Sequence, residues 1–124
     1  MTKQETLAAL LLCQEQFGLA QTLHRFFGPG LRVRLCFSAA AYRMDVAELQ
    51  LSVRSHNALK RAGLFTLEAV VGAIADGSLE KTRNLGRKSL SEIKTVLMQT
   101  CFDRLTPKER EAFFLYILEN NTPL

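Results

Sequence analysis

The chain has few cysteines and no long apolar run. Its three cysteines (Cys13, Cys36 and Cys101) are odd in number and far apart, and no pair has the spacing of metal ligands. We therefore expect reduced thiols, as in a cytosolic protein. The apolar run from Leu7 to Cys13 is too short to span a membrane, and Glu5 before it argues against a signal peptide. These absences predict a cytoplasmic protein without a membrane segment.

The sequence also lacks the residue sets that enzymes use. It contains no Ser/His/Asp or Cys/His arrangement, no pair of carboxylates on one expected element, and no phosphate loop of nucleotide-binding length. His24 lies on an apolar helix face, where a packed, hydrogen-bonded histidine is more common than a metal ligand. We expect a non-enzymatic protein with no catalytic residues, no metal ion and no cofactor.

What the sequence does have is positive charge concentrated in one segment. The 124 residues carry a net charge of +4, and 48% of them are apolar, which is ordinary for a globular domain. Residues 52–99 hold eight basic and four acidic residues, so this segment carries the whole net charge. Such a segment is typical of a polyanion-binding surface, although a solvated helix face would have the same composition.

The most informative stretch runs from Asn84 to Lys94. Asn-Leu-Gly predicts a tight turn, because Gly86 can take a positive φ or lie flush against another backbone. Apolar side chains at helical spacing follow the turn and predict a helix. Free backbone N–H groups at its start, with Arg87 and Lys88 beside them, would form an anion site. We interpret the stretch as a phosphate-holding turn of the helix-hairpin-helix kind.

A second basic helix is predicted upstream, between Ser52 and Gly63. Ser52 is expected to be its N-cap, and Gly63 is expected to close it. The side chains that can face a core are Val53, Ala58, Leu59 and Ala62. Arg54, Asn57 and Arg61 then share one exposed stripe, because they are three and four residues apart.

These two runs, LQLSVRSHNALKRAG and RNLGRKSLSEIKTVL, closely resemble the C-terminal domain of the bacterial RNA polymerase alpha subunit. The resemblance covers roughly residues 45–100. It implies a small bundle of four short helices with an extended lead-in. It also implies a nucleoid-associated, transcription-related protein that binds the minor groove of A/T-rich promoter DNA and touches RNA polymerase sigma factors and activators.

The resemblance further implies which residues form the DNA site. By motif position, Arg54 corresponds to the arginine that inserts into the groove, and Asn57 to its neighbouring asparagine. The other candidate DNA-binding residues are Lys60, Gly86, Arg87, Lys88, Ser89 and, as a weaker member, Glu92. Ser89 and Glu92 also fit a capping box, which would give them a purely structural role.

Two departures from the family pattern are visible in the sequence. The link between the two motifs is about one residue longer, around Asp76-Gly77. Gln50 stands where the family presents an acidic residue to sigma.

Residues 1–44 lie outside the resemblance. Residues 3–27 are expected to be helical, with Gly18 splitting the helix in two. An apolar seam for another helix is expected at Leu10, Cys13, Phe17, Ala20, His24 and Phe27. The alternation from Leu31 to Phe37 is typical of a half-buried strand, which would pair with a second copy in a dimer. Otherwise the segment is helical and continues into Ser38–Ala41.

We therefore predict a mainly α fold, a compact helical bundle with helix-hairpin-helix-type motifs. It has an N-terminal helical arm (1–44), a DNA-binding domain (45–100) and a C-terminal docking helix (101–124), which begins at a Thr106-Pro107 cap. The leading hypothesis is a free-standing protein that binds the minor groove of A/T-rich DNA.

Two alternatives remain open on the sequence alone. The protein is otherwise a protein–protein adaptor that contacts RNA polymerase, a sigma factor or an activator, with weak or no DNA binding. The arm is expected to form a homodimer or to dock on a second protein. The competing interpretation is that the arm folds back as extra layers in a monomer and meets the Phe113–Leu118 helix.

Overall fold

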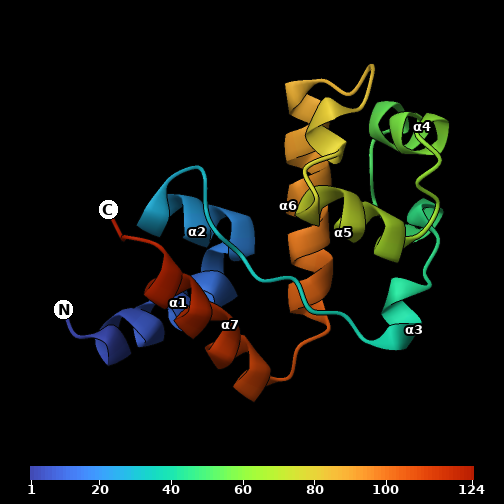
Figure 1. The fold of residues 1–124 in the computed structure, drawn as a ribbon. Coiled ribbons are helices and arrows are strands. Elements are labelled where there is room, and N and C mark those ends of the chain that lie inside the picture. The colour runs from blue at the N-terminus through green and yellow to red at the C-terminus, as the bar shows by residue number, and fades with distance from the viewer. The chain divides into compact units, whose positions relative to one another are not determined.

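The computed structural model describes all residues from 1 to 124 and contains helices and no β-strand (Figure 1). The mainly α fold predicted from the sequence is confirmed. The protein divides into two compact units, which we call the central unit (Leu35–Thr100) and the terminal unit (Met1–Arg34 with Cys101–Leu124). None of the helices combines the length and the apolar character that a membrane span requires.

The central unit contains most of the short helices. They are α3 (Ala39–Tyr42), η1 (Val46–Glu48), α4 (Val53–Arg61), α5 (Leu67–Ala75), η2 (Leu79–Lys81) and α6 (Arg87–Asp103) up to residue 100. Ser52 and Thr66 start α4 and α5 as the sequence predicts, since each side chain accepts a hydrogen bond from the backbone N–H three residues later. The buried core is formed by Ala41, Val46, Leu49, Leu59, Leu67, Val70, Ala73, Leu79, Ile93 and Leu97.

The lead-in to the central unit is held by a short antiparallel contact. Val46 N donates to Phe65 O (2.9 Å) and Leu67 N donates to Met44 O (2.9 Å), on either side of a bridge between Asp45 and Thr66. These bonds fix the loop before α5 to the residues before η1. They therefore set the position of α4, which lies between the two paired segments in sequence.

The terminal unit joins the two ends of the protein. α1 (Lys3–Phe17) packs against α2 (Leu19–Phe27) and α7 (Pro107–Asn120), as Figure 1 shows. The rings of Phe102, Phe113 and Phe114 pack on one another at centroid distances between 5.4 and 5.7 Å. α7 starts at the expected capping box of Thr106 and Glu109, with Pro107 at the first turn. The N-terminal helices thus meet the Phe113–Leu118 helix within one molecule.

The predicted apolar seam along residues 3–27 is wrong in part. Gly18 does split the helix, with φ of 85° and ψ of 166°. Because that break resets the helical phase, spacing counted from α1 does not carry into α2. The buried side chains are Leu10, Leu19, Thr22, Leu23 and Phe27. Ala20 and His24 are exposed, and Phe17 is 44% exposed.

The segment from Leu31 to Phe37 is neither a strand nor a helix in the structure. Its alternation is real, because every second side chain is half-buried and the ones between are exposed. The partner is a side chain instead of a strand: Asn121 Oδ1 accepts from Arg32 N (2.8 Å), and Asn121 Nδ2 donates to Arg32 O (2.9 Å). Asn121 therefore satisfies the backbone N–H and C=O groups of Arg32, which a neighbouring strand would otherwise pair.

Candidate nucleic-acid interface

α4 presents its polar face to solvent. Ser55, Ala58 and Leu59 are buried, whereas Arg54, Asn57 and Lys60 are exposed. The prediction that Val53 faces the core is wrong, and its side chain is 76% exposed. At 100° per residue, Val53 lies about 200° round the helix from buried Ser55. Ala62, also expected in the core, is exposed because the helix ends at Arg61.

The turn before α6 differs from the expectation in one residue. The left-handed conformation falls on Asn84 (φ 66°), not on Gly86. Asparagine tolerates this region better than other residues with a side chain. Gly86 stands at the N-cap position of α6, where its carbonyl accepts from Leu90 N (3.0 Å). A Cβ added at Gly86 would meet no atom of the protein within 4 Å, so no neighbouring backbone lies flush against it.

Glu92 connects the two helices of the site. Its Oε1 accepts from Ser52 N (3.1 Å) and from Ser52 Oγ (2.9 Å), at the N-cap of α4. Hydrogen bonds from the Ser55 hydroxyl, the Ser52 backbone and the Ser52 hydroxyl, in that order, lower the pKa of Glu92 below its ordinary value. Glu92 therefore completes the cap of α4 from α6, and the alternative of a capping box with Ser89 is not the arrangement adopted.

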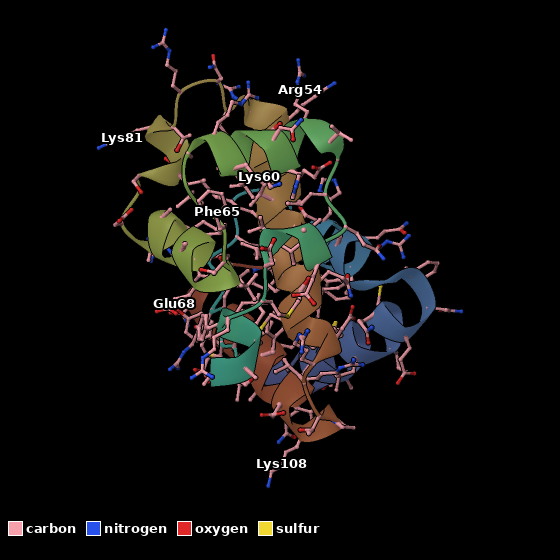
Figure 2. The ribbon with its side chains drawn as sticks, turned by 90° about the vertical axis from the view of Figure 1, so that its right-hand side faces the viewer. Arg54, Lys60, Phe65, Glu68, Lys81 and Lys108 are labelled. Carbon is pink, nitrogen blue, oxygen red and sulfur yellow. The ribbon has the colours of Figure 1, made fainter.

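A hollow of ≈ 340 Å³ lies where these two helix starts meet. It is lined by Arg54, Asn84, Leu85, Gly86, Lys88 and Ser89. Four predicted site residues thus come together from segments more than 30 residues apart in sequence: Arg54, Gly86, Lys88 and Ser89. Ser89 is buried at 6% exposure, whereas Arg54 and Lys88 are exposed. Figure 2 shows Arg54 at the start of α4, pointing away from the ribbon.

The other predicted site residues lie outside the lining of the hollow. Asn57 and Lys60 are exposed further along α4, and Arg87 is exposed at the first position of α6. Two lining residues, Asn84 and Leu85, were not among the candidates. The signal for Asn84 was present in the sequence, because asparagine tolerates the left-handed conformation better than most residues with a side chain.

The positive charge around the hollow is not neutralised by the protein. Six exposed basic side chains without an ion pair lie on the two helices and on the loop between η2 and α6: Arg54, Lys60, Arg61, Arg83, Arg87 and Lys88. The central unit contains one ion pair, between Lys94 and Glu80 (3.3 Å). An anionic ligand would therefore meet free cations here.

A second hollow in the central unit has a different character. It measures ≈ 460 Å³ and is lined by Ala39, Tyr42, Arg43, Glu68, Val71 and Gly72. Arg43 and Glu68 bring charges of both signs to it, so a polyanion gains little there. The hollow between α4 and α6 is the better candidate site for a nucleic acid.

The comparisons with known proteins identify the family to which the central unit is similar. Residues 38–99, half of the sequence, match the family described as the C-terminal domain of the bacterial RNA polymerase alpha subunit. The protein belongs to this family, and is a transcription-related protein of the alpha C-terminal-domain type. This confirms the resemblance inferred from the two motif runs. No solved structure matches the protein.

The similar curated proteins are alpha subunits of RNA polymerase. The DNA-directed RNA polymerase subunit alpha of Symbiobacterium thermophilum is 54% identical over 54 residues, which are 44% of this chain and 17% of that protein. The same subunit of Clostridium perfringens strain 13 is 49% identical over 57 residues, which are 46% of this chain and 18% of that protein. The matched region thus spans less than one fifth of the length of these relatives.

Proposed function

We propose that the central unit binds the minor groove of A/T-rich duplex DNA, in a non-enzymatic, transcription-related role. The observation that carries the proposal is the hollow between α4 and α6, where Arg54 shares one lining with Gly86, Lys88 and Ser89. This arrangement suits the minor groove of DNA, which is flanked by phosphates. The guanidinium can enter the groove, and the positively charged start of α6 can bind a phosphate at its edge.

Each element has a part in this proposal. Arg54 enters the groove, which is narrow in A/T tracts and has its most negative potential there. The start of α6 holds a phosphate through its free backbone N–H groups, with the Lys88 ammonium beside them. Asn57, Lys60 and Arg87 contact the flanking backbone and set the register of the domain on the duplex.

Glu92 has an indirect part. Its carboxylate is already bound at the N-cap of α4, two residues before Arg54. We therefore propose Glu92 as a positioning residue, which keeps Arg54 and the start of α6 at a fixed separation. This changes its expected role from a weak DNA contact to a link between the two contacting helices.

A second function, as an adaptor to RNA polymerase, a sigma factor or an activator, is favoured by Phe65. Its side chain is 51% exposed, on the loop whose backbone Val46 fixes (Figure 2). A large aromatic side chain held on the surface is typical of a protein interface. The two functions are separable, because Phe65 does not line the hollow that holds Arg54.

The test of DNA binding is a salt titration with matched A/T-rich and G/C-rich duplexes. We expect one copy of the protein to bind duplex DNA weakly, with a dissociation constant on the order of 10⁻⁴–10⁻⁶ M at physiological salt. The affinity should fall steeply as the salt concentration rises, and it should be higher for the A/T-rich duplex. Equal and salt-insensitive binding to both duplexes, or no binding at low salt, would contradict the proposal. A Phe65→Ala variant is expected to keep DNA binding. If the protein acts as an adaptor, the same variant is expected to lose binding to its protein partner.

Two substitutions separate groove recognition from phosphate binding. Arg54→Ala is expected to erase the preference for A/T, because it removes the group that enters the groove. Lys88→Ala is expected to weaken binding to all sequences about equally and to lower the salt slope by roughly one. Arg43→Ala is the matched control, because Arg43 is an exposed arginine of the same unit that lines the other hollow. If Arg54→Ala kept the preference, the role given to Arg54 would be wrong.

A further inference from the structure

Arg83 is an exposed cation at the edge of the site that neither the candidate residues nor the lining of the hollow includes. It lies on the loop between η2 and α6, directly before Asn84, which does line the hollow. Its guanidinium forms no ion pair. The residue is therefore adjacent to the proposed groove-binding surface without being part of it.

The loop that carries Arg83 is held on both sides. Thr82 N donates to Leu79 O (3.1 Å), and Thr82 Oγ1 donates to Ser78 O (3.1 Å). After Arg83, Asn84 takes its left-handed turn, and Leu85 packs against the buried core while its N–H donates to Thr82 O (3.3 Å). Arg83 is thus presented by a hydrogen-bonded turn, so little backbone entropy is lost when its side chain binds a ligand.

The neighbouring cation Lys81 differs in its electrostatic surroundings. The positive charge of Lys81 acts on the Asp76 carboxylate and contributes to lowering its pKa, after the hydrogen bonds from Ser78. Lys81 is therefore partly compensated by a nearby carboxylate, and Figure 2 shows it on the opposite side of the view from Arg54. No carboxylate of the structure is paired with Arg83 in this way.

We infer that Arg83 binds a backbone phosphate of the duplex beyond the hollow, so that the DNA-binding surface extends along the loop between η2 and α6. The inference rests on the proposed function, because it assumes that the hollow faces a duplex. A phosphate is the ligand that fits: Arg83 lies outside the lining that faces the groove, and a guanidinium binds phosphate oxygens in a bidentate manner. The site adds one sequence-independent contact to those at α4 and α6.

The experiment compares salt slopes of single substitutions in the 124-residue protein, on the same A/T-rich and G/C-rich duplexes. Arg83→Ala is expected to lower the slope of log affinity against log salt by about 0.9, the value for one lost phosphate contact. The affinity ratio of the parent protein to the variant then changes about 3.5-fold between 50 and 200 mM salt. The ratio of A/T to G/C affinity is expected to stay unchanged, and Arg83→Lys is expected to keep most of the slope.

Lys81→Ala is the matched control, since it removes the same charge two residues away. Its slope is expected to change by less than half as much as that of Arg83→Ala. Equal slopes for the two variants would overturn the inference, because they would report the net charge of the protein and no specific contact. A slope for Arg83→Ala equal to that of the parent protein would also overturn the inference. In that case the proposed function would still stand if the A/T preference of the parent protein is lost in Arg54→Ala. A parent protein without salt-dependent binding overturns both.

Discussion

Gly86 separates the stability of the domain from its proposed binding. The residue stands at the N-cap of α6, has no positive φ, and has open space where a Cβ would lie. The protein itself therefore places no steric demand for glycine at this position. Under the proposed function, a phosphate that approaches the N–H groups of α6 passes close to residue 86, where glycine leaves the most room.

We expect Gly86→Ser to stabilise the protein slightly and to weaken DNA binding. Serine is a better N-cap than glycine, by about 0.3 kcal/mol, so the thermal midpoint should rise or stay level. The added side chain lies in the path of the phosphate, and the loss of one charge-assisted hydrogen bond corresponds to about tenfold in affinity. Thermal unfolding and a duplex titration of the same sample measure both effects. Unchanged affinity would mean that no ligand backbone approaches Gly86.

At the residue scale, the sequence predicted the positions of residues that belong to a local motif. Arg54, Gly86, Arg87 and Lys88 lie at the predicted helix starts, since N-caps and turns depend on a few adjacent residues. Exposure of Val53 and the partner of Glu92 could not be predicted. The first depends on which face of α4 meets the core, and the second on a contact between residues 40 positions apart.

At the scale of elements, α4 and α6 are linked by the hydrogen bonds that Ser52 donates to Glu92. The pKa of Glu92 is lowered in the folded protein, so its carboxylate stabilises the fold above its ordinary pKa of 4.5. That stabilisation is lost as the pH falls through the lowered value, because protonation removes the acceptor that Ser52 and Ser55 use.

We expect Glu92→Gln to reduce the pH dependence of stability and to weaken DNA binding without removing the A/T preference. The parent protein should be more stable than the variant at neutral pH, and the difference should shrink as the pH falls below about 4.5. Denaturant unfolding between pH 3 and pH 7 measures the difference. Glu80→Gln is a suitable control, because Glu80 pairs with Lys94 on the surface and touches neither helix start. A stability difference that stays constant with pH would contradict the role of the carboxylate.

Elements of this protein were predictable to the extent that their signals are local. The caps at Ser52, Thr66 and Thr106 were predicted and are present, because each depends on residues within one helical turn. Spacing patterns were less reliable. The alternation in Leu31–Phe37 reflects side chains that are half-buried at every second position. It could not show that the backbone of this segment bonds to the side chain of Asn121 instead of to a second strand, because Asn121 is distant in sequence.

At the scale of the whole molecule, the first and last parts of the sequence form one unit, and the family domain is contained between them in sequence. Lys3 and Glu119 form an ion pair (3.7 Å), and Leu124 N donates to Phe26 O (2.8 Å), which ties the two ends together. From the sequence we expected an arm and a docking helix, with contact between the arm and the Phe113–Leu118 helix as the competing interpretation. The sequence could not decide between these alternatives, because the association depends on contacts about 100 residues apart, such as those of Lys3 with Glu119 and of Phe26 with Leu124.

Homodimerisation remains a proposal, and the structure narrows the surface that it can use. Leu10 and Phe27, which the sequence assigned to an intermolecular seam, are buried within the terminal unit. The apolar side chains of α1 that stay accessible are Leu12 (67% exposed) and Phe17 (44% exposed), the latter beneath the Arg25 guanidinium at 5.0 Å. A second copy is therefore expected to contact the exposed face of α1 around Leu12.

We expect the 124-residue protein to sediment as a dimer at tens of micromolar, and its Leu12→Glu variant to sediment as a monomer. A charge at this exposed position should change folding stability by no more than about 0.5 kcal/mol, so the variant separates association from unfolding. Ala112→Glu adds the same charge to an exposed position of α7 and should leave the dimer intact.

On a duplex with two A/T tracts, the dimer should bind about 10²–10⁴-fold more tightly than the Leu12→Glu monomer, because its second contact is intramolecular. A monomeric parent protein at these concentrations would exclude the homodimer and leave each central unit to bind DNA singly.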